Sequence, residues 1–178
     1  MRRAILLSLL VLAGACGGGL YGYAREYEPL GEEDDLLEEA TPVNYEDVRR
    51  DPADYRSTTL SWFGVVTNVE PEGSGAGALV ALTHRTHQPR HLCGDETAAS
   101  CRVTVSDRPG GPFSIHLEIR AEEREGTDRL YTGSLIRVYG SPTGEFDSEG
   151  GPIIEARWYR HWPRGKYVTT GASGSMRR

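Results

Sequence analysis

Apolar and polar residues alternate along several short stretches of the chain, and this alternation predicts the secondary structure. It is clearest in FSIHLEIR (113–120), where Ile115, Leu117 and Ile119 are separated by polar residues. A period of two is typical of a strand with one buried face. Further stretches rich in β-branched and aromatic residues lie at 58–69, 78–84, 102–105, 133–144 and 151–163. Together they predict five or six short strands, with 113–120 either separate from 102–105 or its continuation after a loop.

Segments rich in Gly and Pro separate these stretches, and helix signals are few. Asn44 can cap a short helix that Pro52 ends, just before the first strand. Gly64 interrupts the first strand, which predicts a bulge or a tight bend there. The pattern predicts a mainly β fold: a small five- to six-stranded barrel with a short N-terminal helix, or a β-sandwich as the alternative.

The first 15 residues follow a different pattern, with Arg2 and Arg3 before an apolar run from Ala4 to Leu12 and then small residues. A basic start, a short apolar run and a small-residue exit are typical of a secretory signal peptide. The run is shorter than the about 20 residues that a transmembrane helix needs. We therefore expect a signal peptide over residues 1–15 and a mature protein outside the cytoplasm.

The end of this segment, Ala13-Gly14-Ala15-Cys16, resembles the lipobox of bacterial lipoproteins. In that family the cysteine is diacylated and becomes the new N-terminus. The usual lipobox has Leu three residues before the cysteine, whereas Leu12 stands four before it here. The resemblance implies lipidation at Cys16 and attachment to a membrane. The alternative is ordinary cleavage, which yields a soluble periplasmic protein.

The cysteine count agrees with lipidation. The chain has three cysteines, Cys16, Cys93 and Cys101, and an odd number in an exported protein needs an explanation. With Cys16 lipidated, we expect a disulfide between Cys93 and Cys101, because an oxidising compartment allows the pair to form. Such a bridge would pin one loop.

The chain of 178 residues has a formal net charge of −6, and its acidic residues are unevenly distributed. Acidic residues concentrate in 25–42. We expect 16–42 to be an acidic flexible linker after the lipid anchor, 43–168 to be the globular domain and 169–178 to be a disordered tail. A negatively charged exported protein argues against nucleic acid as the partner, because phosphate neutralisation needs Lys and Arg.

Three segments carry a resemblance to a known family: DPADYRSTTLSWFGVVTNV, LYTGSLIRVYGSPTG and PIIEARWYRHW. They resemble the OB-fold modules of exported bacterial proteins, the tRNA_anti-like group, over roughly residues 45 to 163. Gly133, Ile136, Val138 and Gly140 match the fourth-strand pattern of that family, and Ser134 stands where Asp is more usual. The resemblance implies an OB-like barrel that acts as a binding module, although a fold alone does not define a ligand.

His84, His87 and His91 gather near two cysteines in THRTHQPRHLCGDETAASC, and imidazole and thiolate are ligands that suit Zn or Cu. Their spacing fits no metal-binding signature. We therefore interpret the segment as an exposed, disulfide-pinned loop with solvated histidines and expect no cofactor. The alternative is a periplasmic metal-binding carrier or sensor that uses the 84–101 loop.

The stretch RWYRHWPRGK (157–166) interleaves basic and aromatic residues, an arrangement that can stack bases or hold an anionic polymer. Its candidate binding face consists of Arg157, Tyr159, Arg160, His161 and Trp162. We favour the interpretation that this is the closing strand of the barrel. Acidic residues at 145, 147 and 149, near the expected ligand rim, argue further against nucleic acid.

The sequence contains no G-x-S-x-G, H-E-x-x-H or P-loop motif, so we do not expect an enzyme. We expect a lipid-anchored, non-catalytic module of the cell envelope, at the outer membrane or the periplasmic face. Its OB-like barrel would bind an envelope protein or an envelope polymer. The alternatives are the metal carrier or sensor described above and an anionic-polymer binder that uses the strand 157–166.

Overall fold

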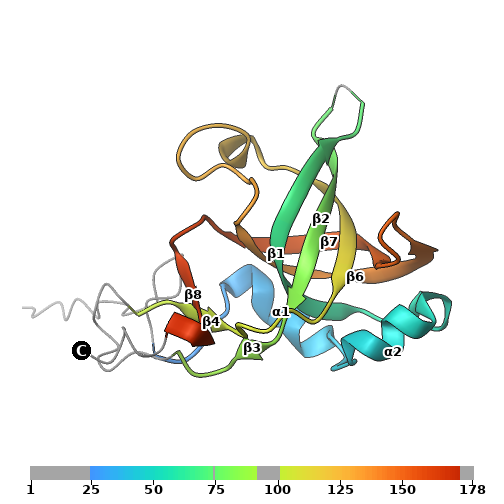
Figure 1. Ribbon diagram of the computed structural model, residues 1–178, viewed down its shortest axis with the longest axis horizontal. Helices are drawn as coiled ribbons and strands as arrows, with labels where there is room; N and C mark the ends of the chain where they lie inside the picture. The colour runs from blue at the N-terminus through green and yellow to red at the C-terminus, as the bar shows by residue number, and fades with distance from the viewer. Residues whose placement is uncertain (1–24, 74, 92–100, 173–178) are drawn as a thin grey trace, which may run out of the picture.

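The computed structural model describes residues 25–73, 75–91 and 101–172, and its main feature is a closed five-stranded barrel (Figure 1). The barrel strands are β1 (Leu60–Pro71), β2 (Gly77–Arg85), β5 (Pro112–Glu118), β6 (Leu135–Phe146) and β7 (Pro152–Trp162). A second, three-stranded sheet contains β3 (His87–Gln88), β4 (Val103–Val105) and β8 (Tyr167–Thr169). The helices are α1 (Gly31–Glu39) and α2 (Tyr45–Arg50), with 3₁₀ turns η1 (Pro52–Tyr55), η2 (Ala121–Glu123) and η3 (Thr170–Ala172).

The strand order defines the barrel as OB-like. The order is β1-β2-β5-β7-β6, and β1 pairs antiparallel with both β2 and β6, which closes the ring. The third and fifth barrel strands, β5 and β7, are parallel and pair over Ser114–His116 and Ile153–Glu155. The predicted small, mainly β, OB-like barrel is confirmed. The β-sandwich alternative is wrong, because one sheet closes on itself.

The barrel interior holds the side chains that alternation assigns to a buried face. Phe113 and Ile115 of β5 are fully buried, and so is every second residue from Ala78 to Leu82 on β2. Tyr45 of α2 and Leu130 of the β5–β6 connection also pack into this core. Each such apolar side chain contributes about 1.5–3 kcal/mol by leaving water, so this cluster is the main stabilising feature of the barrel.

Gly64 does not form the bulge predicted there. It stays in register with His84 on β2 and Ile136 on β6, and the irregularity in β1 falls between Val66 and Asn68. A Cβ atom on Gly64 would lie 2.7 Å from the ring of Phe113. The close approach of that ring explains why this position carries a glycine.

The small sheet covers part of the outer surface of the barrel. Val103 and Val105 of β4 pack with Phe63, Leu135 and Trp162 in a second apolar cluster. Strand β8 pairs in parallel with β4, and η3 follows it up to Ala172. The expected disordered tail at 169–178 is therefore wrong for residues 169–172, while 173–178 lie outside the described residues.

The acidic N-terminal segment is part of the folded unit. Helix α1 lies against the outer face of β6 and β7, and Glu33 on it is fully buried. Its carboxylate lies 3.0 Å from Arg160 Nη1 and 3.4 Å from Arg137 Nη1, and it accepts a hydrogen bond from Tyr139 Oη at 2.8 Å. Arg137 and Arg160 face each other across antiparallel strands, so one carboxylate offsets the repulsion of two like charges.

The expectation of a flexible, solvated linker is thus wrong over 25–42. Residues 16–24 lie outside the described residues, as does the expected signal peptide.

Candidate functional site: a groove between β5 and β7

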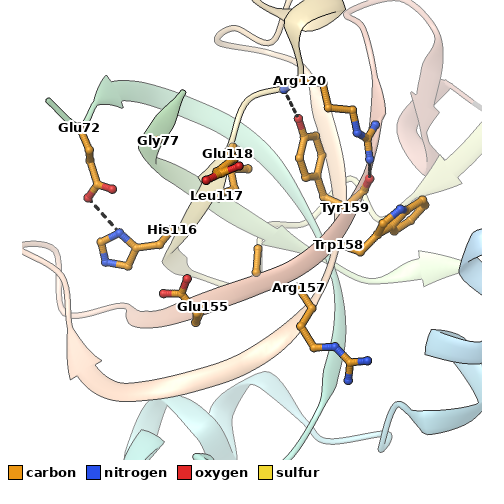
Figure 2. Close-up of a pocket in the computed structure, with 11 residues that line it drawn as sticks. Glu72, Gly77, His116, Leu117, Glu118, Arg120, Glu155, Arg157, Trp158 and Tyr159 are labelled. Atoms are coloured by element: carbon orange, nitrogen blue, oxygen red, sulfur yellow. Dashed lines mark hydrogen bonds and ion pairs between the residues drawn. The ribbon is translucent and has the colours of Figure 1, made fainter. Parts of the chain in front are cut away.

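A groove of about 560 Å³ opens on the outside of the barrel beside the parallel β5–β7 pair (Figure 2). Residues from β2, β5, β7 and the end of the β1–β2 hairpin contribute to it. The lining residues are Glu72, Gly77, His116, Leu117, Glu118, Arg120, Glu155, Ala156, Arg157, Trp158 and Tyr159.

The register of the strands explains why the groove lies there. The parallel ladder includes only three residue pairs and ends at His116 and Glu155. Beyond that point β5 remains paired with β2, with Glu118 opposite Gly77, while β7 follows β6. The two strands therefore separate, and side chains of both faces line the space between them: His116, Glu118 and Glu155 from the outer face, and Leu117 and Tyr159 from the core side (Figure 2).

One half of the groove is acidic. Glu72 Oε1 lies 2.9 Å from His116 Nδ1, so this carboxylate has a partner. Glu118 and Glu155 are both exposed on the groove, and neither has a hydrogen-bond or ion-pair partner among the described residues. Two carboxylates without counter-charges give this half of the groove an attraction for cationic groups.

The other half contains aromatic rings and two arginines, and each arginine already pairs with a glutamate. Arg157 Nη1 lies 2.6 Å from Glu39 Oε1 of α1. The guanidinium of Arg120 lies over the ring of Tyr159, 4.3 Å from its centroid, and also pairs with Glu123 at 3.4 Å. The paired arginines contribute shape and stacking surface here, and the two unpaired carboxylates dominate the charge of the groove.

A buried polar cluster lies beside the half of the groove that contains Arg120 and Tyr159. Glu123 Oε1 lies 3.2 Å from His161 Nδ1, and its other oxygen accepts a hydrogen bond from the hydroxyl of Tyr159. Burial opposes ionisation of Glu123, but the hydrogen bonds from His161 and Tyr159 outweigh it and lower its pKa below the ordinary value. A second hollow of about 320 Å³ lies beside this cluster, and Trp158 and Arg120 line both hollows. The cluster therefore fixes the position of the strand that carries the groove's aromatic wall.

The candidate binding face at 157–162 is mostly inaccessible. Tyr159, Arg160, His161 and Trp162 are buried, and Arg157 alone of the five is exposed. The inner face of β7 places Tyr159 in the barrel core, and its outer face places Arg160 beneath α1. Four of the five side chains are therefore structural, which corrects the candidate binding face, and residues 157–162 belong to a barrel strand, as the favoured interpretation has it.

The histidines are not solvated loop residues. His84 continues the inward pattern of β2 and stacks on Tyr45 with ring centroids 4.9 Å apart, whereas His87 stacks on Phe63 at 4.5 Å. Burial lowers the pKa of His84 to about 4 and of His87 to about 3. His91 is 2 % exposed, and burial lowers its pKa to about 4. The structure places the rings of His84 and His87 in separate aromatic environments.

The cysteine predictions are only partly within the described residues. Cys101 is buried and disulfide-bonded. Cys93 and Cys16 lie outside the described residues, so the predicted pairing partner and the predicted lipidation site do as well. Of the acidic residues at 145–149, Asp147 organises its own turn, because it accepts hydrogen bonds from the backbone of Glu149 and Gly151.

Sequence reasoning missed the groove carboxylates, although the signal for one of them was present. Alternation in 113–120 already assigned Glu118 to the outer face of a strand. Its proximity to Glu155, which follows 37 positions later, depends on the parallel pairing of two strands that are distant in sequence. That pairing has no local sequence signature.

No protein-family model matches the chain, and no curated protein matches it in sequence. Across the part of the chain that the structure describes, no helix has the length and apolar character needed to cross a membrane. Within the same residues, no group of three or more His, Cys, Asp or Glu is arranged to hold a metal ion.

Proposed function

We propose that this protein is a lipid-anchored, non-catalytic module of the bacterial cell envelope. In this proposal Cys16 carries the lipid, and the groove between β5 and β7 binds an extended, basic segment of an envelope protein. The observation that carries the proposal is the groove itself, with Glu118 and Glu155 exposed in it and unpaired.

The shape of the groove favours an extended chain. It lies where two parallel strands separate, and extended peptides commonly bind along strand edges, where the main chain supplies affinity and side-chain contacts supply specificity. The charge of the groove favours basic side chains, since the unpaired groups are both carboxylates. The resemblance of the fold to OB-fold modules of exported proteins supports a binding role of this kind.

The groove is tested by site-specific photo-crosslinking in the native membrane. A photo-crosslinking residue replaces Glu118 in the full-length protein, and the matched control carries it at Glu145, an exposed glutamate of β6 outside the groove. We expect a discrete crosslinked species from position 118 that is absent from position 145. Glu155→Lys, combined with the crosslinker at 118, should remove most of that species because it reverses the charge of the groove. Equal crosslinking from both positions, or no effect of Glu155→Lys, would contradict the proposal.

The anchor is tested by the intact mass of the protein extracted from its own membrane. A chain that begins at a diacylated Cys16 is expected, and Cys16→Ser should move the protein to the soluble fraction. An unmodified Cys16 in membrane-extracted protein would exclude the anchored form while leaving the groove experiment unaffected.

A further inference from the structure

The small sheet and its flanking segments carry a positive charge that contrasts with the acidic remainder of the chain. Their described residues are 85–91, 101–111 and 163–172. The basic residues there are Arg85, Arg90, Arg102, Arg108, Arg164 and Lys166. Asp107 is the single acidic residue in these described ranges. In a protein of net charge −6, this is a pronounced separation of charge.

Strand pairing brings four of the basic residues to one end of the small sheet. Val103 pairs with Tyr167, so Arg102 and Lys166 precede paired residues on neighbouring parallel strands. Gln88 pairs with Thr104, which directs the next residues of that strand, including Arg90, toward the same end. Arg164 lies in the turn that leads into β8, and it is exposed, as Arg90 is. We call Arg90, Arg102, Arg164 and Lys166 the basic end.

The N-terminal segment joins the fold at this same end. His91 donates its backbone N–H to the carbonyl of Arg25 at 2.6 Å, and Tyr27 donates to the carbonyl of Pro89 at 3.0 Å. Eight residues lie between Cys16 and Arg25, so the nine steps from one Cα atom to the other span at most about 30 Å. A lipid on Cys16 therefore holds the basic end within reach of the membrane surface.

We propose that the basic end rests on the anionic phospholipid headgroups of the leaflet that holds the lipid anchor. This inference rests on the lipidation of Cys16 in the proposed function. The diacylated cysteine supplies the attachment itself, and a cluster of basic residues beside it adds an electrostatic interaction with the surface that holds the barrel in one orientation. Anionic headgroups attract Lys and Arg that lie within a Debye length of the surface.

Among the described residues this end stays positive, because Arg25 of the N-terminal segment adds to the four basic residues and only two acidic residues stand against them. Glu26 and Glu28 lie on the N-terminal segment, and Asp95 and Glu96 belong to residues outside the described ranges. Asp107 lies beyond the opposite end of β4, where Thr169 donates a hydrogen bond to its carboxylate at 3.4 Å. Arg90 and Arg164 are exposed, so their side chains are the ones whose contact with the headgroups we test.

The arrangement also orients the groove. In Figure 1 the small sheet and the tip of the β1–β2 hairpin lie at opposite ends of the molecule. Glu72, near that tip, lines the groove. With the basic end on the membrane, the acidic half of the groove faces away from the lipid surface, where a partner can approach it.

The test measures binding of the mature-length chain, residues 16–178 with Cys16→Ser, to lipid vesicles, so that neither an acyl chain nor the apolar run of residues 4–12 contributes. We expect binding to vesicles of phosphatidylcholine mixed with phosphatidylglycerol, little binding to phosphatidylcholine alone, and weakening by added salt. Arg90→Gln combined with Arg164→Gln should weaken binding roughly tenfold or more, since each basic group near the surface is worth about fivefold. The matched control is Arg49→Gln with Arg50→Gln, two arginines on α2 away from the small sheet.

Two results would overturn this inference: equal binding to both kinds of vesicle, or an equal loss of binding in the Arg49/Arg50 control. Circular dichroism of both double variants verifies that they are folded. The vesicle assay uses an unlipidated chain, so its failure is distinct from a failure to find lipid on Cys16 by mass.

Discussion

At the scale of single residues, Glu33 has the largest expected effect on stability. Its carboxylate is fully buried between Arg137 and Arg160, which lie opposite each other on neighbouring strands. Removing one partner of a buried ion pair leaves uncompensated charge, and the desolvation of that charge is no longer offset. Here the removal would leave two buried guanidinium groups without their shared carboxylate.

We therefore expect Glu33→Gln to lower the free energy of unfolding by about 3–5 kcal/mol. The measurement is urea denaturation followed by tryptophan fluorescence. Glu38→Gln is the matched control, because Glu38 is exposed on the same helix and should change the free energy by no more than about 0.5 kcal/mol. A similar small change in both variants would show that the ion pairs of Glu33 contribute little to the free energy of unfolding.

Glu123 gives a second prediction, which concerns pH. Its pKa is lower in the folded protein than the ordinary value of about 4.3, so its ionised form favours folding above that pH. The contribution is lost as the pH falls through the lowered pKa. Glu123→Gln should therefore be less stable than the wild type at pH 7, and the difference should narrow as the pH falls below about 4. A difference that stays constant with pH would exclude this electrostatic role.

At the scale of elements, the segment of residues 25–39 behaves as a part of the barrel and not as a spacer. It covers the paired arginines of β6 and β7, and Tyr27 on it contacts Phe63 and Trp162. A chain that begins at Thr41 should unfold at a lower urea concentration than a chain that begins at Arg25. A synthetic peptide of residues 25–40 should raise the midpoint again, and the same peptide with Glu33→Gln should not. An unchanged midpoint after the deletion would show that the segment is dispensable.

The sequence predicted the barrel strands well because alternation and turn residues are local signals. It did not predict the site of α1, because eight acidic residues at 26–39 indicate a solvated segment unless their partners are known. The partners of Glu33 are Arg137 and Arg160, more than 100 positions away. The error on the histidines is of another kind, because the sequence did contain a signal for His84. His84 continues the inward period of Ala78, Val80 and Leu82, a local signal that assigns it to the core face.

At the scale of the whole molecule, the buried histidines make the protein sensitive to acid. The pKa values of His84 and His87 fall to about 4 and about 3 on folding, and unfolded histidines titrate near 6.5. A lowered pKa means that the neutral form favours folding, so its contribution is complete above pH 6.5 and is lost as the pH falls toward these values. His91, with a pKa of about 4, adds to the same trend.

We expect the urea midpoint to fall steadily between pH 6.5 and pH 4. His87→Phe keeps an aromatic ring beside Phe63 and removes the titrating group, so the midpoint should depend less steeply on pH in that variant. Thr86→Ala is the matched control, because Thr86 is exposed, lies next to His87 and does not titrate, so the slope should stay that of the wild type. An unchanged slope in His87→Phe would assign the acid sensitivity to other groups.

The docking of residues 25–39 has a mechanical consequence for a protein held by its N-terminus. Tension applied before Arg25 first reaches the backbone hydrogen bond from His91 to Arg25 and the one from Tyr27 to Pro89, and then the ion pairs of Glu33. Strand β1, which closes the barrel on both sides, lies further along the chain. A moderate force would therefore detach residues 25–39 from the barrel and extend them, while the barrel strands stay paired. In the anchored form that we propose, the released segment would lengthen the connection between the membrane and the barrel.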